Sequence, residues 1–191
     1  MKKTFFAVVA TLALSFTAAQ AEPVTYGFDK DHSSIEFHVN HFGYSNFQAE
    51  FGDFDGELVF DQDKPESSSV SVTIDVKSID TDVAKLDEHL KSADFFDVAK
   101  YPTMTFKSKS IKVTGENKGE ITGDLTLHGV TKEVVLQTTL NKAAVHPMTK
   151  KDHVGFSATA TIKRSDFGIK TYIPAVGDEV KINIETEAGA K

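Results

Sequence analysis

The sequence of 191 residues contains no cysteine and no tryptophan. Without cysteine the chain can form neither a disulfide nor a thiolate metal site, so its fold must rest on packing alone. A cysteine nucleophile and a lipid anchor on cysteine are excluded for the same reason. Neither a G-x-S-x-G motif nor a phosphate-cradling glycine loop is present, and the common signatures of hydrolases and nucleotide-binding proteins are therefore missing.

Basic residues are also in short supply, with 21 lysines and arginines against 28 aspartates and glutamates. The net charge is −7, and it becomes −9 if Lys2 and Lys3 are removed with a leader. Such a surface repels nucleic acid and anionic membranes. We therefore expect no nucleic-acid partner.

Long apolar runs are confined to the N-terminus. Lys2 and Lys3 precede twelve apolar residues at 5–16, and an Ala-Gln-Ala cleavage site ends at Ala21. This layout is typical of a cleaved secretory signal peptide, and twelve apolar residues are too few to span a bilayer. We expect a signal peptide at residues 1–21, a single mature domain at 22–191 and no stable membrane insertion.

Apolar and polar residues alternate with a period of two along most of the mature chain. This pattern is typical of half-buried antiparallel strands. Clear and weaker alternations together predict eight to ten strands, at residues 24–28, 35–41, 47–51, 54–61, 70–77, 103–110, 121–127, 134–140, 154–162 and 180–184. Many short strands joined by polar turns indicate a barrel or a sandwich, and a barrel is favoured because closure removes exposed edges.

One segment, residues 80–102, breaks the alternation. Val83, Leu86 and Leu90 recur at helical spacing, and Asp80 or Thr81 is available as N-cap. The pattern predicts one short helical insertion at about residues 82–96. Periodicity leaves open whether this helix closes an end of the barrel or packs against its outside.

Three of the seven histidines lie within residues 31–45. His32 is expected in a turn at residues 30–33. His38 and His41 are three residues apart on one strand, so they should point to opposite faces, His38 outward and His41 inward. No histidine belongs to an H-x-H or H-E-x-x-H motif. We therefore predict no metal site and no catalytic residue.

Phenylalanine is abundant, with fifteen residues in the chain and twelve after residue 21. Its side chain adds apolar surface without a polar group. Ordinary core filling explains any single phenylalanine. Collectively they also suit the interior of an eight-stranded barrel, which is wide enough to hold one small ligand.

Four blocks of sequence, in order and covering nearly the whole mature chain, resemble the YceI-like lipid/polyisoprenoid-binding family. The blocks are residues 31–58, residues 78–106, residues 121–136, and residues 166–170 followed by 176–185. The resemblance implies a periplasmic, lipocalin-like, extended eight-stranded antiparallel barrel that holds an isoprenoid or similar amphiphile. The family commonly has a basic residue in the helix where this chain has Leu86, and the lack of tryptophan excludes the ordinary lipocalin G-x-W signature.

We therefore predict an all-β barrel that acts as a periplasmic carrier for a non-covalently bound isoprenoid, quinone or fatty-acyl amphiphile. The candidate ligand-binding residues come from the inward faces of the strands, from the helical segment and from the residues that follow it. They are Phe37, Val39, His41, Phe60, Ile74, Leu90, Phe95, Phe96, Leu125, Leu127 and Phe156. Strands of about eight residues would span about 26 Å, so a long polyprenyl chain should bend or protrude.

Two other functions are compatible with the residues. One is a structural or stress-related interaction module whose barrel is solidly packed and holds no ligand. The other is a lipid-modifying enzyme that uses His41, or Asp87 with His89. The sequence leaves the oligomeric state open, a homodimer included.

Overall fold

A computed structural model describes residues 22–191, and the predicted signal peptide at 1–21 lies outside the described residues. The strands are β1 (Val24–His41), β2 (Ser45–Phe51), β3 (Phe54–Phe60), β4 (Ser69–Asp75), β5 (Ile79–Asp80), β6 (Thr103–Gly115), β7 (Lys118–Leu127), β8 (Val130–Val145), β9 (Asp152–Lys163) and β10 (Val176–Ala190). The helical elements are α1 (Ala84–Lys91) and the 3₁₀ turns η1 (Pro65–Ser67), η2 (Val76–Ser78) and η3 (Arg164–Phe167). Within residues 22–191, no helix has the length and apolar character needed to cross a bilayer.

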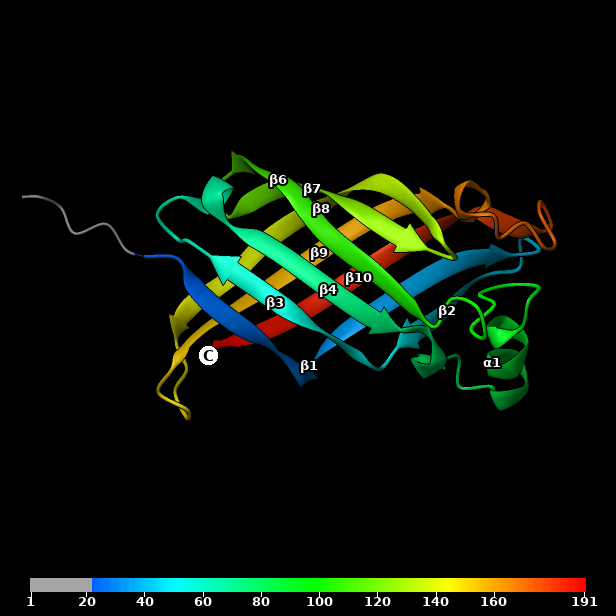
Figure 1. Ribbon diagram of the computed structural model, residues 1–191, viewed down its shortest axis with the longest axis horizontal. Helices are drawn as coiled ribbons and strands as arrows, with labels where there is room; N and C mark the ends of the chain where they lie inside the picture. The colour runs from blue at the N-terminus through cyan, green and yellow to red at the C-terminus, as the bar shows by residue number, and fades with distance from the viewer. Residues whose placement is uncertain (1–21) are drawn as a thin grey trace, which may run out of the picture.

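The strands form one antiparallel sheet that closes on itself (Figure 1). Its order is β10-β9-β8-β7-β6-β4-β3-β1-β2-β5, and pairing of β10 with β1 completes the ring. Strands β2 and β3 both pair with β1 and act as one strand interrupted at Gly52 and Asp53, while β5 adds only two residues beside β2. The predicted all-β, eight-stranded antiparallel barrel with one short helix is confirmed.

The long strands correct the sequence prediction. Strand β1 has 18 residues, β8 has 16 and β10 has 15. At about 3.3 Å per residue they extend for roughly 50–60 Å, so the expected span of about 26 Å is wrong. The predicted turn at residues 30–33 is also wrong, because β1 continues through it with a β-bulge between Asp29 and Ser34. The bulge shifts the side-chain parity and makes one long strand look like two short ones.

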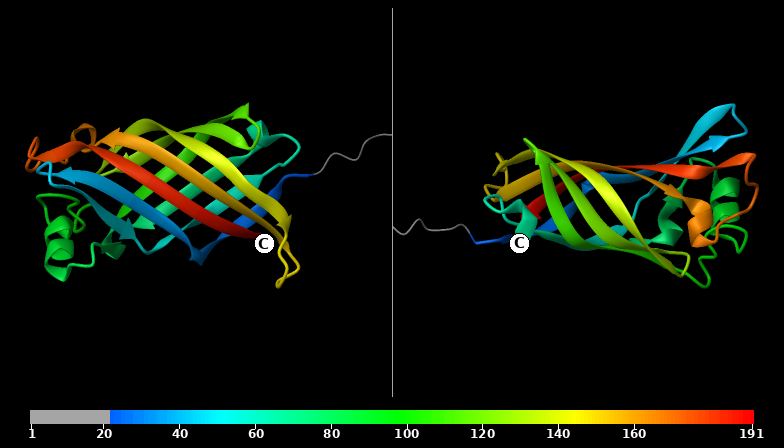
Figure 2. Two further views of the ribbon diagram at one scale, coloured as in Figure 1. Left: turned by 180° about the vertical axis from the view of Figure 1, so that it is seen from behind. Right: turned by 90° about the horizontal axis from the view of Figure 1, so that it is seen from above.

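Helix α1 is shorter than the predicted range of 82–96, since it ends at Lys91 and turns follow it. Thr81 is not its N-cap, a position held by Val83. Instead the backbone N–H and the hydroxyl of Thr81 donate to Oδ1 of Asp87, at 2.9 and 2.6 Å. The helix lies at one end of the barrel, which settles the alternative that the sequence left open (Figures 1 and 2).

The buried core is divided into two clusters inside the barrel. The cluster at the helix end includes Phe51, Ile74, Val76, Leu127 and Phe167 among its buried residues. The second cluster consists of the buried residues Tyr26, Leu58, Phe60, Val154 and Ala188. Apolar residues between them are only partly buried, so the interior is not packed continuously from end to end.

Gly56 occupies a point where two strands approach closely. It pairs with Val72 of β4, and a Cβ at Gly56 would lie 2.1 Å from the carbonyl oxygen of Ser71. We expect Gly56→Ala to destabilise the fold by about 3 kcal/mol and to lower Tm by about 6–12 °C, because backbone on both sides of the clash must move. Thermal and urea unfolding measure the effect.

Gly155→Ala is the matched control for this substitution. Gly155 also lies within a strand, but the nearest atoms to a Cβ there are 3.8 Å away, which is ordinary contact. We expect its Tm to stay within about 2 °C of the wild type. Equal Tm values for the two variants would contradict the steric account of Gly56.

Candidate functional site

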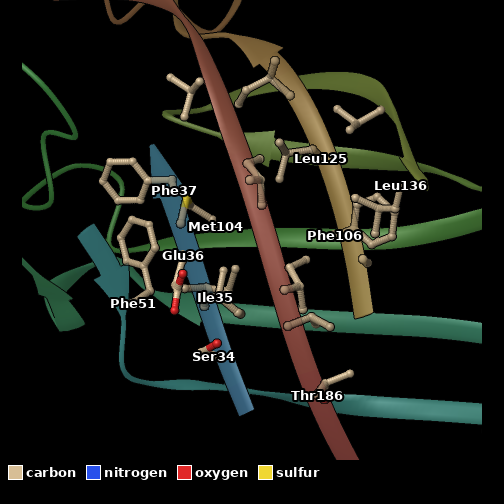
Figure 3. A pocket seen from close by; sticks show the side chains of 18 of the residues that line it. Ser34, Ile35, Glu36, Phe37, Phe51, Met104, Phe106, Leu125, Leu136 and Thr186 are labelled. Atoms are coloured by element: carbon tan, nitrogen blue, oxygen red, sulfur yellow. The ribbon is translucent and has the colours of Figure 1, made fainter. Parts of the chain in front are cut away.

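The interior of the barrel contains an apolar cavity of about 760 Å³ (Figure 3). Its walls come from the inward-facing residues of successive strands, because alternate side chains of each strand point to the barrel axis. The volume lies within the range of about 300–1,000 Å³ that small-molecule sites occupy. The cavity is therefore large enough for a ligand with a hydrocarbon tail.

All eleven residues that the sequence nominated line this one cavity. They are Phe37, Val39, His41, Phe60, Ile74, Leu90, Phe95, Phe96, Leu125, Leu127 and Phe156. These residues differ in how much of their surface is exposed. Phe60, Ile74 and Leu127 are at most 8% exposed and belong to the packed clusters, whereas Phe37 and Leu125 keep accessible surface toward the hollow. Phe37 and Leu125 therefore offer more surface to a ligand.

Aromatic rings gather between α1 and the barrel. The ring centroids of Phe37 and Phe51 lie 5.5 Å apart, and Phe96 contacts both, at 6.4 Å from Phe37 and 5.7 Å from Phe51. Phe95 packs against the rings of His89 and Tyr172, at 5.1 and 6.2 Å. These contacts place the helix exit against the cavity, and Leu86 and Leu90 of α1 also line it.

The polar groups at this end do not converge as a catalytic site requires. His41 is exposed, and its ring lies 4.6 Å from that of Phe42. Asp87 is engaged by Thr81, and Nε2 of His89 lies 3.8 Å from Oδ2 of Asp94. Asp87 and His89 therefore have separate partners. The arrangement can contact a polar headgroup, but it lacks the nucleophile–base geometry of acyl-transfer enzymes.

His38 lies on the outer face of the barrel, as strand parity predicts. Nδ2 of Asn183 on β10 lies 3.0 Å from its Nε2. The structure therefore separates His38 from His41, which is on the cavity side of the same strand.

Sequence reasoning missed the cavity wall at the end opposite α1. Ile111, Val113 and Ile121 line the cavity there, together with the polar residues Asn117 and Lys118 of the β6–β7 hairpin. The predicted strand 103–110 stopped too early, because a bulge between Ser108 and Ser110 switches the inward positions from even to odd numbers. The alternation of Ile111 and Val113 with polar neighbours was the signal in the sequence that this strand continues beyond residue 110.

A buried arginine, which was not predicted from the sequence, holds the backbone at the mouth of the cavity, which is the end next to α1. Arg164 of η3 is 6% exposed and donates three hydrogen bonds to backbone carbonyls, of Gly177 at 2.8 Å, Val176 at 3.0 Å and Ile169 at 3.2 Å. Burial lowers the pKa of Arg164 from its ordinary value, and the charge of Asp178 opposes that shift. Arg164 thus fixes the segment that carries Tyr172.

Comparison with known proteins agrees with this architecture. Residues 26–188 match the model of the YceI-like domain. A UPF0312 protein of Pseudomonas aeruginosa is 42% identical over 189 residues, which covers 98% of this chain and 97% of that protein. The crystal structure of a YceI protein from Campylobacter jejuni matches with a TM-score of 0.74 at 36% identity, over 80% of this chain and 90% of that one.

A more distant structure shares the fold. A polyisoprenoid binding domain from Saccharophagus degradans matches with a TM-score of 0.69 at 14% identity, over 88% of this chain and 99% of that domain. The match to the family model extends over most of residues 22–191, and the P. aeruginosa relative is similar along its whole length. This chain therefore belongs to the YceI-like family.

Proposed function

We propose that this protein, after removal of residues 1–21, is a periplasmic carrier for an isoprenoid, quinone or fatty-acyl amphiphile. The observation that carries the proposal is the apolar cavity of about 760 Å³ inside the closed barrel. The fold shared with the polyisoprenoid binding domain of S. degradans supports the ligand class. The ligand binds non-covalently, with its tail along the barrel axis and its headgroup near His41 and His89.

The energetics of tail burial favour this function. Each buried CH₂ contributes about 0.8 kcal/mol, so a tail of twenty carbons offers on the order of 15 kcal/mol before costs. Association and ordering of the tail offset a large part of this gain. The remainder still suffices for micromolar binding or tighter, without any specific polar contact.

The geometry weighs against the two other functions. A solidly packed interaction module would leave no cavity of this size between its core clusters. A lipid-modifying enzyme would need convergent polar groups beside the tail, whereas Asp87 and His89 have separate partners. The carrier is therefore the function that these residues support best.

Native mass spectrometry of the protein purified from its own periplasm tests the proposal. We expect a chain that begins at Glu22 and carries one lipid-sized adduct, which organic extraction releases. A protein that is isolated empty and then binds none of the lipids extracted from the same cells would contradict the carrier function. A mass that retains residues 1–21 would contradict the export step alone.

A further inference from the structure

A cluster of metal-ligating groups lies on the outer face of the barrel, at the end opposite α1. One atom each from Asp29 of β1, His153 of β9 and Glu187 of β10 lie within 4.8 Å of one another. Strand parity directs these side chains outward, since the neighbouring Val154 and Ala188 are buried inside. The cluster is therefore separate from the cavity.

The strand register explains how the three residues meet. Asp29 pairs directly with Glu187 across β1 and β10, and on the other side of β10 Glu187 pairs with Gly155. His153 pairs with Gly189, two positions along the strand from Glu187. Both of these partners are glycines, so neither places a side chain between His153 and Glu187. Nε2 of His153 reaches Oε2 of Glu187 at 3.0 Å.

The charges in this cluster are unbalanced. Two carboxylates directly opposite each other on neighbouring strands repel one another. Among residues 22–191, the ion-pair contacts of Asp29 and Glu187 are with His32, at 2.9 Å, and His153, at 3.0 Å, and none is with a lysine or arginine. The position between the carboxylates therefore favours a cation.

The β-bulge of β1 holds this arrangement in place. The Ser33 hydroxyl donates to the Asp29 carbonyl at 2.6 Å, and the N–H of Glu187 donates to the Ser33 oxygen at 3.0 Å. The N–H of Asp31 donates to Oδ1 of Asp29 at 3.1 Å, and Nδ1 of His32 contacts Oδ2. These contacts orient the Asp29 carboxylate beside Glu187, as the outer groups of a metal site orient its ligands.

We propose that Asp29, His153 and Glu187 form a surface binding site for a divalent transition metal of the Zn²⁺ class. One imidazole and two carboxylates match the ligand preferences of Zn²⁺, whereas Ca²⁺ and Mg²⁺ favour oxygen ligands alone. Water completes the coordination shell at this partly exposed position. The three side chains are half-buried, and one ligand atom from each already lies within 4.8 Å of the other two.

His146 stands next to this site but is not one of the ligands. Its ring centroid lies 4.9 Å from that of His153. Its Nδ1 accepts hydrogen bonds from the N–H groups of Met148 and Thr149, at 3.3 and 3.2 Å. Because Nδ1 is engaged by these backbone groups, this nitrogen is not available to a metal. His146 instead packs beside the His153 ring.

Calorimetric titration of the mature protein with Zn²⁺ alone tests the site. Competition with a chromogenic chelator gives a second measure of the Zn²⁺ affinity. We expect one Zn²⁺ per chain and no comparable binding of Ca²⁺. His153→Ala and Glu187→Gln should each weaken Zn²⁺ binding by at least tenfold, and circular dichroism checks that both variants fold. His38→Ala removes another outer-face histidine and should leave the affinity unchanged.

Three results would overturn the proposal. They are the absence of stoichiometric Zn²⁺ binding to the wild type, full affinity in the double variant of His153→Ala and Glu187→Gln, and loss of binding in His38→Ala. If His153→Ala does not fold, the near-isosteric Glu187→Gln decides alone. Lipid binding is measured separately, so failure of the carrier function leaves this test valid.

Discussion

Replacement of Leu125 by arginine is expected to weaken the binding of a long-chain lipid by more than about 100-fold. Leu125 of β7 points into the cavity and retains accessible surface there (Figure 3). A guanidinium at this position either remains charged in an apolar wall, at a cost of several kcal/mol, or draws water into the space that the tail needs. Each 1.4 kcal/mol corresponds to a factor of ten in affinity.

Displacement of a fluorescent C18 fatty acid measures this effect, with quinone and isoprenoid alcohols as competitors. Val135→Arg is the matched control, because Val135 is 41% exposed on the neighbouring strand β8, beside the cavity-lining Leu136. We expect the control to bind like the wild type. Unchanged affinity in Leu125→Arg would remove this residue from the binding surface, and Leu125→Gln provides a milder variant if the arginine prevents folding.

The largest loss of stability is expected from Arg164→Met. The substitution keeps an extended apolar side chain but leaves the carbonyls of Ile169, Val176 and Gly177 without their donor. Hydrogen bonds from a charged donor contribute about 1.5–3 kcal/mol each, and buried acceptors without a partner are costly. We expect the free energy of unfolding to fall by about 4 kcal/mol and Tm to fall by about 8–16 °C.

Thermal unfolding followed by circular dichroism checks this expectation. The exposed neighbour Lys163 provides the control, because Lys163→Met changes the same kind of charge without a buried partner. Arg164→Lys should fall between the wild type and Arg164→Met, since an ammonium cannot reach three separate carbonyls in the planar geometry of a guanidinium. A change in Tm below 2 °C in Arg164→Met would show that the three hydrogen bonds contribute little to stability.

The consequences of Arg164→Met should extend to the mouth of the cavity. The segment that Arg164 holds includes Tyr172, which packs against Phe95, and Thr171, whose hydroxyl donates to the Asp94 carbonyl at 2.7 Å. Loosening this segment removes support from the helix exit. In a variant that remains folded, we therefore expect faster release of a bound fatty acid.

The inward faces of the strands were predictable wherever a strand is regular. Phe37 and Val39 alternate with polar neighbours, as do Leu125 and Leu127, and parity alone assigned each of them to the barrel interior. Prediction failed at the bulges, where one strand was read as two or ended early. An inserted residue reverses the parity without leaving a local signature, because glycine or proline is not required there.

The helix was likewise predictable only in part: its presence follows from local spacing, whereas its position depends on residues distant in the sequence. The spacing of Leu86 and Leu90 predicted a helix, although the helix ends at Lys91, with Ser92 as its C-cap, before the predicted residue 96. Its position at the end of the barrel depends on Phe96, which meets Phe37 and Phe51 from distant strands. Those contacts follow from the closure of the sheet, and periodicity does not contain them.

By itself the sequence determined the class of the fold, the sign of the surface charge and the apolar character of the inward face. Each depends on composition or on the alternation of near neighbours, which a strand converts directly into two faces. Only the tertiary structure decided that the interior is hollow. The size of a cavity depends on how much of the space enclosed by the ring of strands is filled by side chains, and the sequence does not show that enclosed space. The meeting of Asp29, His153 and Glu187 likewise depends on strand register, which pairing across the closed sheet sets.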